Sequence, residues 1–154
     1  MRLVWWAAIL AFAVDQASKY VVVHMMSVQT RGPIEVFPPL LRFIYGENHG
    51  INFGLGQGIS RWALIALAGA ICLWLLWWIR QANATPVAKI CAGLVIGGAL
   101  GNVIDRLIYG YVLDFLNMSC CGINNPFVFN VADIFIFAGA IGLVLVTPDP
   151  KKRA

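Results

Sequence analysis

Charged residues are scarce in this chain. They make up 12% of its 154 residues, whereas apolar residues make up 60%, and soluble domains carry roughly 25% charged residues. This scarcity excludes a soluble domain and indicates an integral membrane protein. At about 20 residues per span, the length allows one membrane domain, 1–154, with roughly four transmembrane helices and short connections.

Side chains that bind metals are also few. The chain has four cysteines and two histidines, and His24 and His49 lie along one loop without clustered cysteines or acids at ligand spacing. We therefore expect no metal and no cofactor. The net charge of +4 does not come from a basic patch interleaved with aromatic residues, so no nucleic-acid partner is expected.

The cysteines are not expected to take part in catalysis. Cys120 and Cys121 are adjacent, and adjacent cysteines rarely bridge each other without strain. Cys72 and Cys91 lie nearer the side of the membrane that is expected to be cytoplasmic, out of reach of the other two cysteines. They are predicted to pack as small apolar groups.

Long apolar stretches predict four transmembrane helices, at about 3–23, 62–79, 88–108 and 127–146. The first could be a cleaved signal peptide, because Arg2 precedes its apolar run. The apolar character resumes at Tyr20 to Val23, which favours a full span. The chain is therefore predicted to be an all-α membrane protein with one small β-sheet.

The predicted sheet lies in the loop between the first two helices, residues 24–61, which is too long for a simple turn. Two short strands, Ile34–Phe37 and 40–45, are predicted on either side of Pro38-Pro39. We expect a small extracytoplasmic sheet at the membrane surface. Its apolar side chains suit a surface that dips into the membrane interface or cradles an apolar substrate, or a lid that only packs on the helices.

The distribution of charge predicts the orientation. Four spans place both termini on one side, and that side carries six cations and one acid, whereas the other side carries five cations and six acids. Cytoplasmic loops are enriched in lysine and arginine. Both termini are therefore predicted to be cytoplasmic, with the polar chemistry toward the extracytoplasmic face. The six cations are Arg2, Arg80, Lys89, Lys151, Lys152 and Arg153.

Carboxylates are predicted to gather just beneath the extracytoplasmic surface. A helix rises 1.5 Å per residue, so Asp15 lies about 20 Å along its helix and Asp133 about 9 Å below the outer surface. Asp114 lies just beyond the third predicted helix. Carboxylates at such depths are costly and are usually functional.

Polar residues accompany these acids at helical spacing. Asn130 precedes Asp133 by three residues, and Asn102 precedes Arg106 by four, so each pair shares one helix face. Asp15 and Lys19, at positions i and i+4, can support the site or simply pair with each other.

Two carboxylates that share a proton can act as acid and base. The ionised carboxylate would take a proton from a water that attacks an amide carbonyl, and the protonated one would bind the carbonyl oxygen. This is the arrangement of aspartic proteases. From these residues alone, a proton relay in a proton-coupled transporter and a set of buried structural pairs remain alternatives.

Five short motifs occur in order along the chain. Together they resemble the signature blocks of lipoprotein signal peptidase (signal peptidase II), and the resemblance covers almost the whole sequence. The motifs are Asp15-Gln16-Ala17-Ser18-Lys19, Glu47-Asn48-His49-Gly50-Ile51-Asn52-Phe53-Gly54, Gly101-Asn102-Val103-Ile104-Asp105-Arg106, Val112-Leu113-Asp114-Phe115 and Phe129-Asn130-Val131-Ala132-Asp133.

The resemblance implies an aspartyl endopeptidase of the bacterial cytoplasmic (inner) membrane. It would remove signal peptides from prolipoproteins, before the cysteine that carries diacylglycerol. Its partners would be this substrate and membrane lipid, with no obligate protein partner. One departure is Asn52, where the family usually has a small residue, which puts the detail of the substrate pocket in doubt.

The resemblance also implies roles for individual residues. Asp114 and Asp133 match the family's catalytic pair, and Asp15 matches a carboxylate that supports the site. The residues that match the polar lining of the active site are Asn48, Asn102, Arg106 and Asn130. Asp105 is expected to be structural because it points to another helix face than Arg106.

A stripe of glycines runs along the third predicted helix. Gly93, Gly97 and Gly101 are spaced by four residues, which lets a neighbouring helix approach closely. The stripe could also make room for an acyl chain.

Overall fold

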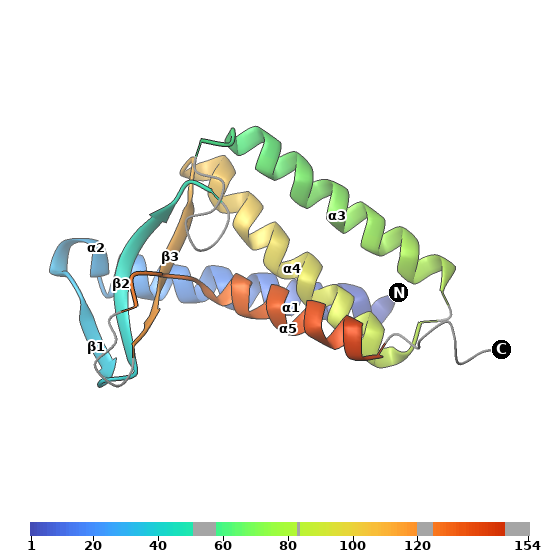
Figure 1. The fold of residues 1–154 in the computed structure, drawn as a ribbon, viewed down its shortest axis with the longest axis horizontal. Helices are drawn as coiled ribbons and strands as arrows, with labels where there is room; N and C mark the ends of the chain where they lie inside the picture. Colours follow the sequence, from blue (N-terminus) through green and yellow to red (C-terminus); the bar gives the residue numbers. More distant parts are fainter. Residues whose placement is uncertain (51–57, 83, 120–124, 147–154) are drawn as a thin grey trace.

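The computed structural model describes residues 1–50, 58–82, 84–119 and 125–146. Long helices form a bundle, and a small antiparallel sheet stands across one end of it (Figure 1). The N-terminal end of α1 and the C-terminal end of α5 both lie at the end away from the sheet (Figure 1). The elements are α1 (Arg2–Lys19) with a π-helical continuation (Tyr20–Met25), α2 (Val28–Arg31), β1 (Ile34–Phe37), β2 (Leu41–Asn48), α3 (Arg61–Gln81), α4 (Pro86–Ile108), β3 (Val112–Met118) and α5 (Val131–Val146).

The helices have the length and surface of membrane spans. Among the described residues, three helical segments are long and apolar enough to cross a membrane: Arg2–Met25, Arg61–Gln81 and Pro86–Ile108. α5 is equally apolar but has 16 residues, which corresponds to about 24 Å against a hydrocarbon core of about 30 Å. Large apolar side chains such as Trp77 and Val144 are exposed on the outside of the bundle, as side chains that face lipid are. The protein is a membrane protein.

α4 is the central helix because its glycines admit both neighbours. A Cβ atom at Gly93 would lie 2.5 Å from the backbone oxygen of Val4, and one at Gly98 would lie 2.6 Å from that of Ala132. One at Gly97 would overlap the backbone of Ala8. The predicted close helix packing is confirmed, and α1 fills the space in which an acyl chain was the alternative.

The fourth predicted helix starts later than expected. α5 begins at Val131 instead of residue 127, because the preceding residues pair with the sheet. The backbones of Phe129 and Leu116 exchange two hydrogen bonds, of 3.0 and 2.8 Å, and Asn130 then caps the helix.

The sheet has strand order β1-β2-β3 and is antiparallel throughout. Both predicted strands exist, with the second extending to Asn48. The sheet also has a third strand that was not predicted, because β3 comes from the segment after α4. β3 is buried over most of its length, so its sequence lacks the apolar–polar alternation that identifies a half-exposed strand.

The sheet is fixed to the end of the bundle by its own apolar cluster. Val22, Val23 and Val28, which follow α1, pack against Leu113 and Phe115 of β3. This packing holds β3 against the helices. The other apolar side chains of the loop either pack against this cluster or are exposed.

Among the loop side chains, Phe43 contacts Phe115 edge-on at 5.6 Å between ring centroids. Phe37, at the tip of the sheet, is 62% exposed. Cys72 and Cys91 are buried, as predicted. Asn52, Cys120 and Cys121 lie outside the described residues.

Candidate active site

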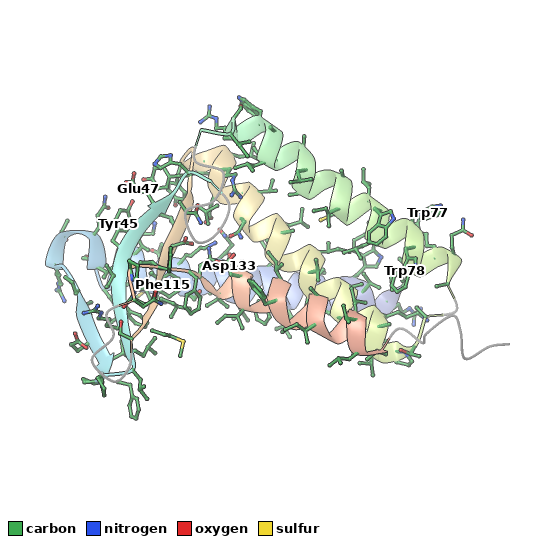
Figure 2. The ribbon with its side chains drawn as sticks, viewed as in Figure 1. Tyr45, Glu47, Trp77, Trp78, Phe115 and Asp133 are labelled. Atoms are coloured by element: carbon green, nitrogen blue, oxygen red, sulfur yellow. The ribbon has the colours of Figure 1, made fainter. Side chains whose placement is uncertain are left out.

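Asn130 and Asp133 cap the start of α5 reciprocally. The Asn130 side-chain oxygen accepts the backbone N–H of Asp133 at 3.0 Å, and Asp133 Oδ2 accepts the backbone N–H of Asn130 at 3.2 Å. This is the geometry of a capping box, which satisfies two backbone donors that the first helical turn would leave unpaired. The Asp133 carboxylate therefore has one orientation, at the junction of helices and sheet (Figure 2).

Asp114 reaches the same place from the sheet. It lies in β3 opposite Gly46 of β2. Its Oδ1 atom accepts a hydrogen bond of 2.6 Å from the Asn130 side chain, and its Oδ2 atom accepts one of 3.0 Å from Asn48. Asn130 thus contacts both aspartates, one through its side chain and the other through its backbone.

Asn102 of α4 completes this polar group. It donates a hydrogen bond of 3.1 Å to Asp133 Oδ1. Its own side-chain oxygen accepts hydrogen bonds from Asn130 at 3.2 Å and from Lys19 at 3.4 Å. The structure therefore brings together five of the predicted site residues: Asn48, Asn102, Asp114, Asn130 and Asp133.

The two aspartates are almost completely removed from solvent, with 2% exposure for Asp114 and 3% for Asp133. Burial raises the pKa of Asp114 to about 7, and the negative charge of Asp133 contributes in the same direction. Hydrogen bonds from Asn48 and Asn130 and the charge of Lys19 oppose this rise. Two carboxyl groups so placed can divide the roles of acid and base near neutral pH.

Arg106 lies beside the aspartates, but its donors are used within the chain. Its Nη2 atom donates to the backbone oxygen of Gly50 at 2.7 Å, and Nη1 donates to that of Asn102 at 3.2 Å. Gly50 N in turn donates to the side chain of Asn48 at 3.1 Å. Arg106 therefore holds the loop that carries Asn48 through a backbone carbonyl.

Asp15 reaches the same region from α1. It pairs with Lys19 at 2.7 Å, as the spacing of the two residues predicted. Its other oxygen accepts the backbone N–H of Ala132, adjacent to Asp133, at 2.9 Å. The predicted pairing is therefore present, and Asp15 also contacts the backbone next to Asp133.

Comparison with known proteins identifies the family. Residues 7–147 match the family model described as signal peptidase (SPase) II. The chain belongs to the signal peptidase II family. Proteins named lipoprotein signal peptidase from Aeromonas hydrophila and Alteromonas mediterranea are 43% and 38% identical to it, each over 91% of this chain, and over 84% and 77% of their own lengths.

Solved structures share the fold. One described as a bacterial membrane enzyme, determined by the in meso method at 2.3 Å resolution, has a TM-score of 0.78 and 27% identity and covers 91% of this chain and 84% of its own. Membership of this peptidase family makes the chain an enzyme, a protease of the aspartic type. It does not support the alternative of a proton-coupled transporter.

Two residues near the aspartates were given no role in the site from the sequence. Gln16 donates hydrogen bonds of 3.1 Å to both Asp15 and Asp105. Asp105, expected to be structural, pairs with Lys19 at 2.7 Å and accepts the backbone N–H of Leu113 at 3.2 Å. The only sequence signal was their position inside motifs of the signal peptidase II family.

The histidines lie in other surroundings. His24 is 3.4 Å from the hydroxyl of Tyr109, and His49 is 3.5 Å from Glu47. Within the described ranges, no three histidine, cysteine or acidic side chains are grouped so as to hold a metal ion.

Proposed function

We propose that this chain removes the signal peptide of diacylglyceryl-modified prolipoproteins, cutting before the lipidated cysteine, with Asp114 and Asp133 as the catalytic pair. The observation that carries the proposal is the double contact of Asn130, which joins two buried carboxylates at the end of a membrane bundle. The names of the relatives support the substrate class.

The chemistry needs only the pair and one water. The ionised carboxylate accepts a proton from the water as its oxygen attacks the scissile carbonyl carbon, and the protonated carboxyl donates to the carbonyl oxygen. The tetrahedral intermediate then breaks its C–N bond, and the amine of the lipidated cysteine leaves with a proton from the pair. A pKa of about 7 for Asp114 suits a pair that holds one proton near neutral pH, and the two groups titrate jointly.

The amides around the pair have two proposed tasks. Asn48 and Asn130 donate to Asp114 and favour its ionised form. Asn102 donates to Asp133. In the complex with substrate, Asn48 and Asn102 would also hold the peptide on either side of the bond that is cut. Arg106 keeps the Asn48 loop in place through Gly50.

We infer four transmembrane spans, with α5 as the fourth, in the bacterial cytoplasmic membrane. Arg2, Arg80 and Lys89 lie at the end of the bundle away from the sheet, near the ends of α1, α3 and α4, and cations favour the cytoplasmic side. The acidic residues within the described part of the chain belong to the sheet and to the helix ends near it. Both termini are then cytoplasmic, and the catalytic pair faces the extracytoplasmic side.

Anchoring of the substrate would supply much of its positioning. The diacylglyceryl chains stay in the bilayer beside the helices, and the peptide lies beneath the sheet. Holding two reactants in the right geometry makes a bimolecular step effectively unimolecular. We expect no cofactor, no nucleic acid and no obligate protein partner.

The test is cleavage by detergent-purified protein. A diacylglyceryl-modified prolipoprotein is compared with its unmodified precursor, using wild type, Asp114→Asn, Asp133→Asn and, as a matched control, Glu35→Gln on exposed β1. We expect cleavage of the lipidated substrate only, lost in both aspartate variants and kept in the control. Full activity of either folded variant would remove that residue from the pair. Absence of wild-type cleavage, where another family member is active, would overturn the function.

A further inference from the structure

A buried cluster of charged residues lies next to the catalytic pair and takes no part in the proposed chemistry. It consists of Asp15, Lys19 and Asp105, which are 0%, 2% and 1% exposed. We refer to these three residues as the Lys19 cluster. Buried ion pairs of this kind are weak evidence for stability, because the cost of desolvation offsets the attraction between the charges.

Lys19 joins two carboxylates from different helices. Its Nζ atom lies 2.7 Å from Asp15 Oδ2 and 2.7 Å from Asp105 Oδ2. Gln16 spans the same two side chains with hydrogen bonds of 3.1 Å each. The ends of α1 and α4 are therefore held together at this level by charge-assisted contacts.

Each of these carboxylates also holds the backbone immediately before one catalytic aspartate. Asp15 Oδ1 accepts the N–H of Ala132, one residue before Asp133. Asp105 Oδ2 accepts the N–H of Leu113, one residue before Asp114. The two catalytic residues are thus linked through a continuous path of hydrogen bonds and ion pairs that passes through Lys19.

A third contact connects Lys19 to the pair more directly. Its Nζ atom lies 3.4 Å from the side-chain oxygen of Asn102. An ammonium group attracts the oxygen of an amide, so the nitrogen of Asn102 is turned toward Asp133. The reverse orientation would place an amide oxygen against a carboxylate.

We propose that Lys19 is a positioning residue: by joining Asp15 to Asp105 and orienting Asn102, it sets the relative placement of Asp114 and Asp133. The proposal rests on the proposed function, since it assigns a role toward that reaction. Misplacement of reacting groups by about 1 Å can lower a rate by about 100-fold. The expected defect is therefore in kcat, with KM little changed.

The charge of Lys19 has a second consequence that a purely structural residue would not produce. The charged side chains that act on Asp114 are Asp133 from α5, Arg106 from α4 and Lys19 from α1. The positive charge of Lys19 lowers the pKa of Asp114. Removing that charge raises this pKa, so the loss of activity at alkaline pH moves to higher pH.

The experiment measures kcat, KM and the pH profile for the lipidated substrate. It compares wild type with Lys19→Met, Asp105→Asn and the matched control Lys89→Met at the other end of α4. We expect Lys19→Met to lose kcat by about 100-fold with KM nearly unchanged and the alkaline limb shifted upward. Asp105→Asn should lose less, and Lys89→Met should behave as wild type.

Asp105→Asn covers the case in which Lys19→Met does not fold. It keeps the size of the side chain. It also leaves Asp15 and Lys19 as one ion pair with no net charge, so the bundle should assemble. Wild-type kcat and an unchanged pH profile in the folded variants would overturn the proposal, as would a loss of activity that only follows the loss of folded protein. Because wild type must cleave in the same assay, these outcomes are distinct from a failure of the proposed function.

Discussion

The side chain of Asn130 donates a hydrogen bond of 2.6 Å to Asp114 Oδ1, although Asn130 caps helix α5 and Asp114 lies within strand β3. The same asparagine exchanges two capping hydrogen bonds with Asp133 at the start of α5. One residue therefore has two separable tasks, to start α5 and to hold Asp114 beside it.

These tasks can be separated by the variant Asn130→Ser. Serine caps helices about as well as asparagine but is too short to reach Asp114. We expect thermal stability close to wild type and a fall in kcat of roughly 10- to 100-fold, because a hydrogen bond to a charged group contributes about 1.5–3 kcal/mol. The matched variant Asn130→Ala should lose the same activity and also about 1 kcal/mol of stability. Wild-type activity in Asn130→Ser would contradict the role of the side chain.

The pH dependence of cleavage should report the shared proton of the pair. Burial and the charge of Asp133 raise the pKa of Asp114 to about 7, so the second proton leaves near that pH and activity declines above it. The donor Asn48 lowers this pKa. Asn48→Ala should therefore move the alkaline limb to higher pH. Asn125→Ala, on a surface segment, is the control. If activity declined at the same alkaline pH in the two variants, the alkaline limb would not report the proton of Asp114.

The same carboxylate should reduce stability at high pH. A pKa raised from 3.8 to about 7 means that the folded protein keeps this proton where the unfolded chain releases it. Stability thus falls as pH rises between those values, by at most about 4 kcal/mol. A protonated carboxyl and an amide are both uncharged, and each pairs a carbonyl acceptor with a donor group. Asp114→Asn should therefore have the same melting temperature as wild type at pH 5 and a higher one than wild type at pH 8, measured by thermal denaturation in detergent.

The control for this stability prediction is Glu35→Gln, which neutralises an exposed carboxylate and should not change the difference between the two pH values. An Asp114→Asn protein that gains no stability at pH 8 would show that the carboxylate is not buried at a cost.

The parts of the fold that follow local rules could be predicted from the sequence. The apolar runs predicted the helices, and the short apolar segments on either side of Pro38-Pro39 predicted β1 and β2. The spacing of Asn130 and Asp133 indicated one helix face, and their reciprocal cap follows from that spacing. Each of these features depends on residues within a few positions of each other.

The parts that were missed depend on distant contacts. β3 lacks alternation because it is covered on both sides, so Asp114 was placed only at a helix boundary. The partner of Arg106 is a backbone oxygen 56 residues away, and the bond from Leu113 to Asp105 forms only because β3 returns over the end of α4. Residue types alone do not encode such partners.

The contact between α1 and α4 should tolerate no added methyl group. A Cβ atom at Gly97 would overlap the backbone of Ala8, whereas one at Gly69 of α3 would meet nothing within 4 Å. Gly97→Ala should lower stability by about 1–3 kcal/mol through overpacking. The matched control Gly69→Ala should be neutral or gain up to about 1 kcal/mol from helix propensity. Thermal denaturation of the two proteins compares them, and equal melting would contradict the close helix contact.

Arg106 should be irreplaceable by lysine, although the charge is retained. Its planar fork donates to Gly50 and to Asn102 at once, and the single ammonium of lysine does not reproduce this geometry. In Arg106→Lys we expect faster backbone hydrogen exchange at residues 48–50 and a fall in kcat/KM of at least about tenfold, which corresponds to 1.4 kcal/mol. Arg31→Lys, on exposed α2, should change neither quantity. Unchanged exchange at residues 48–50 together with reduced activity would show that Arg106 acts on the substrate and does not hold the loop.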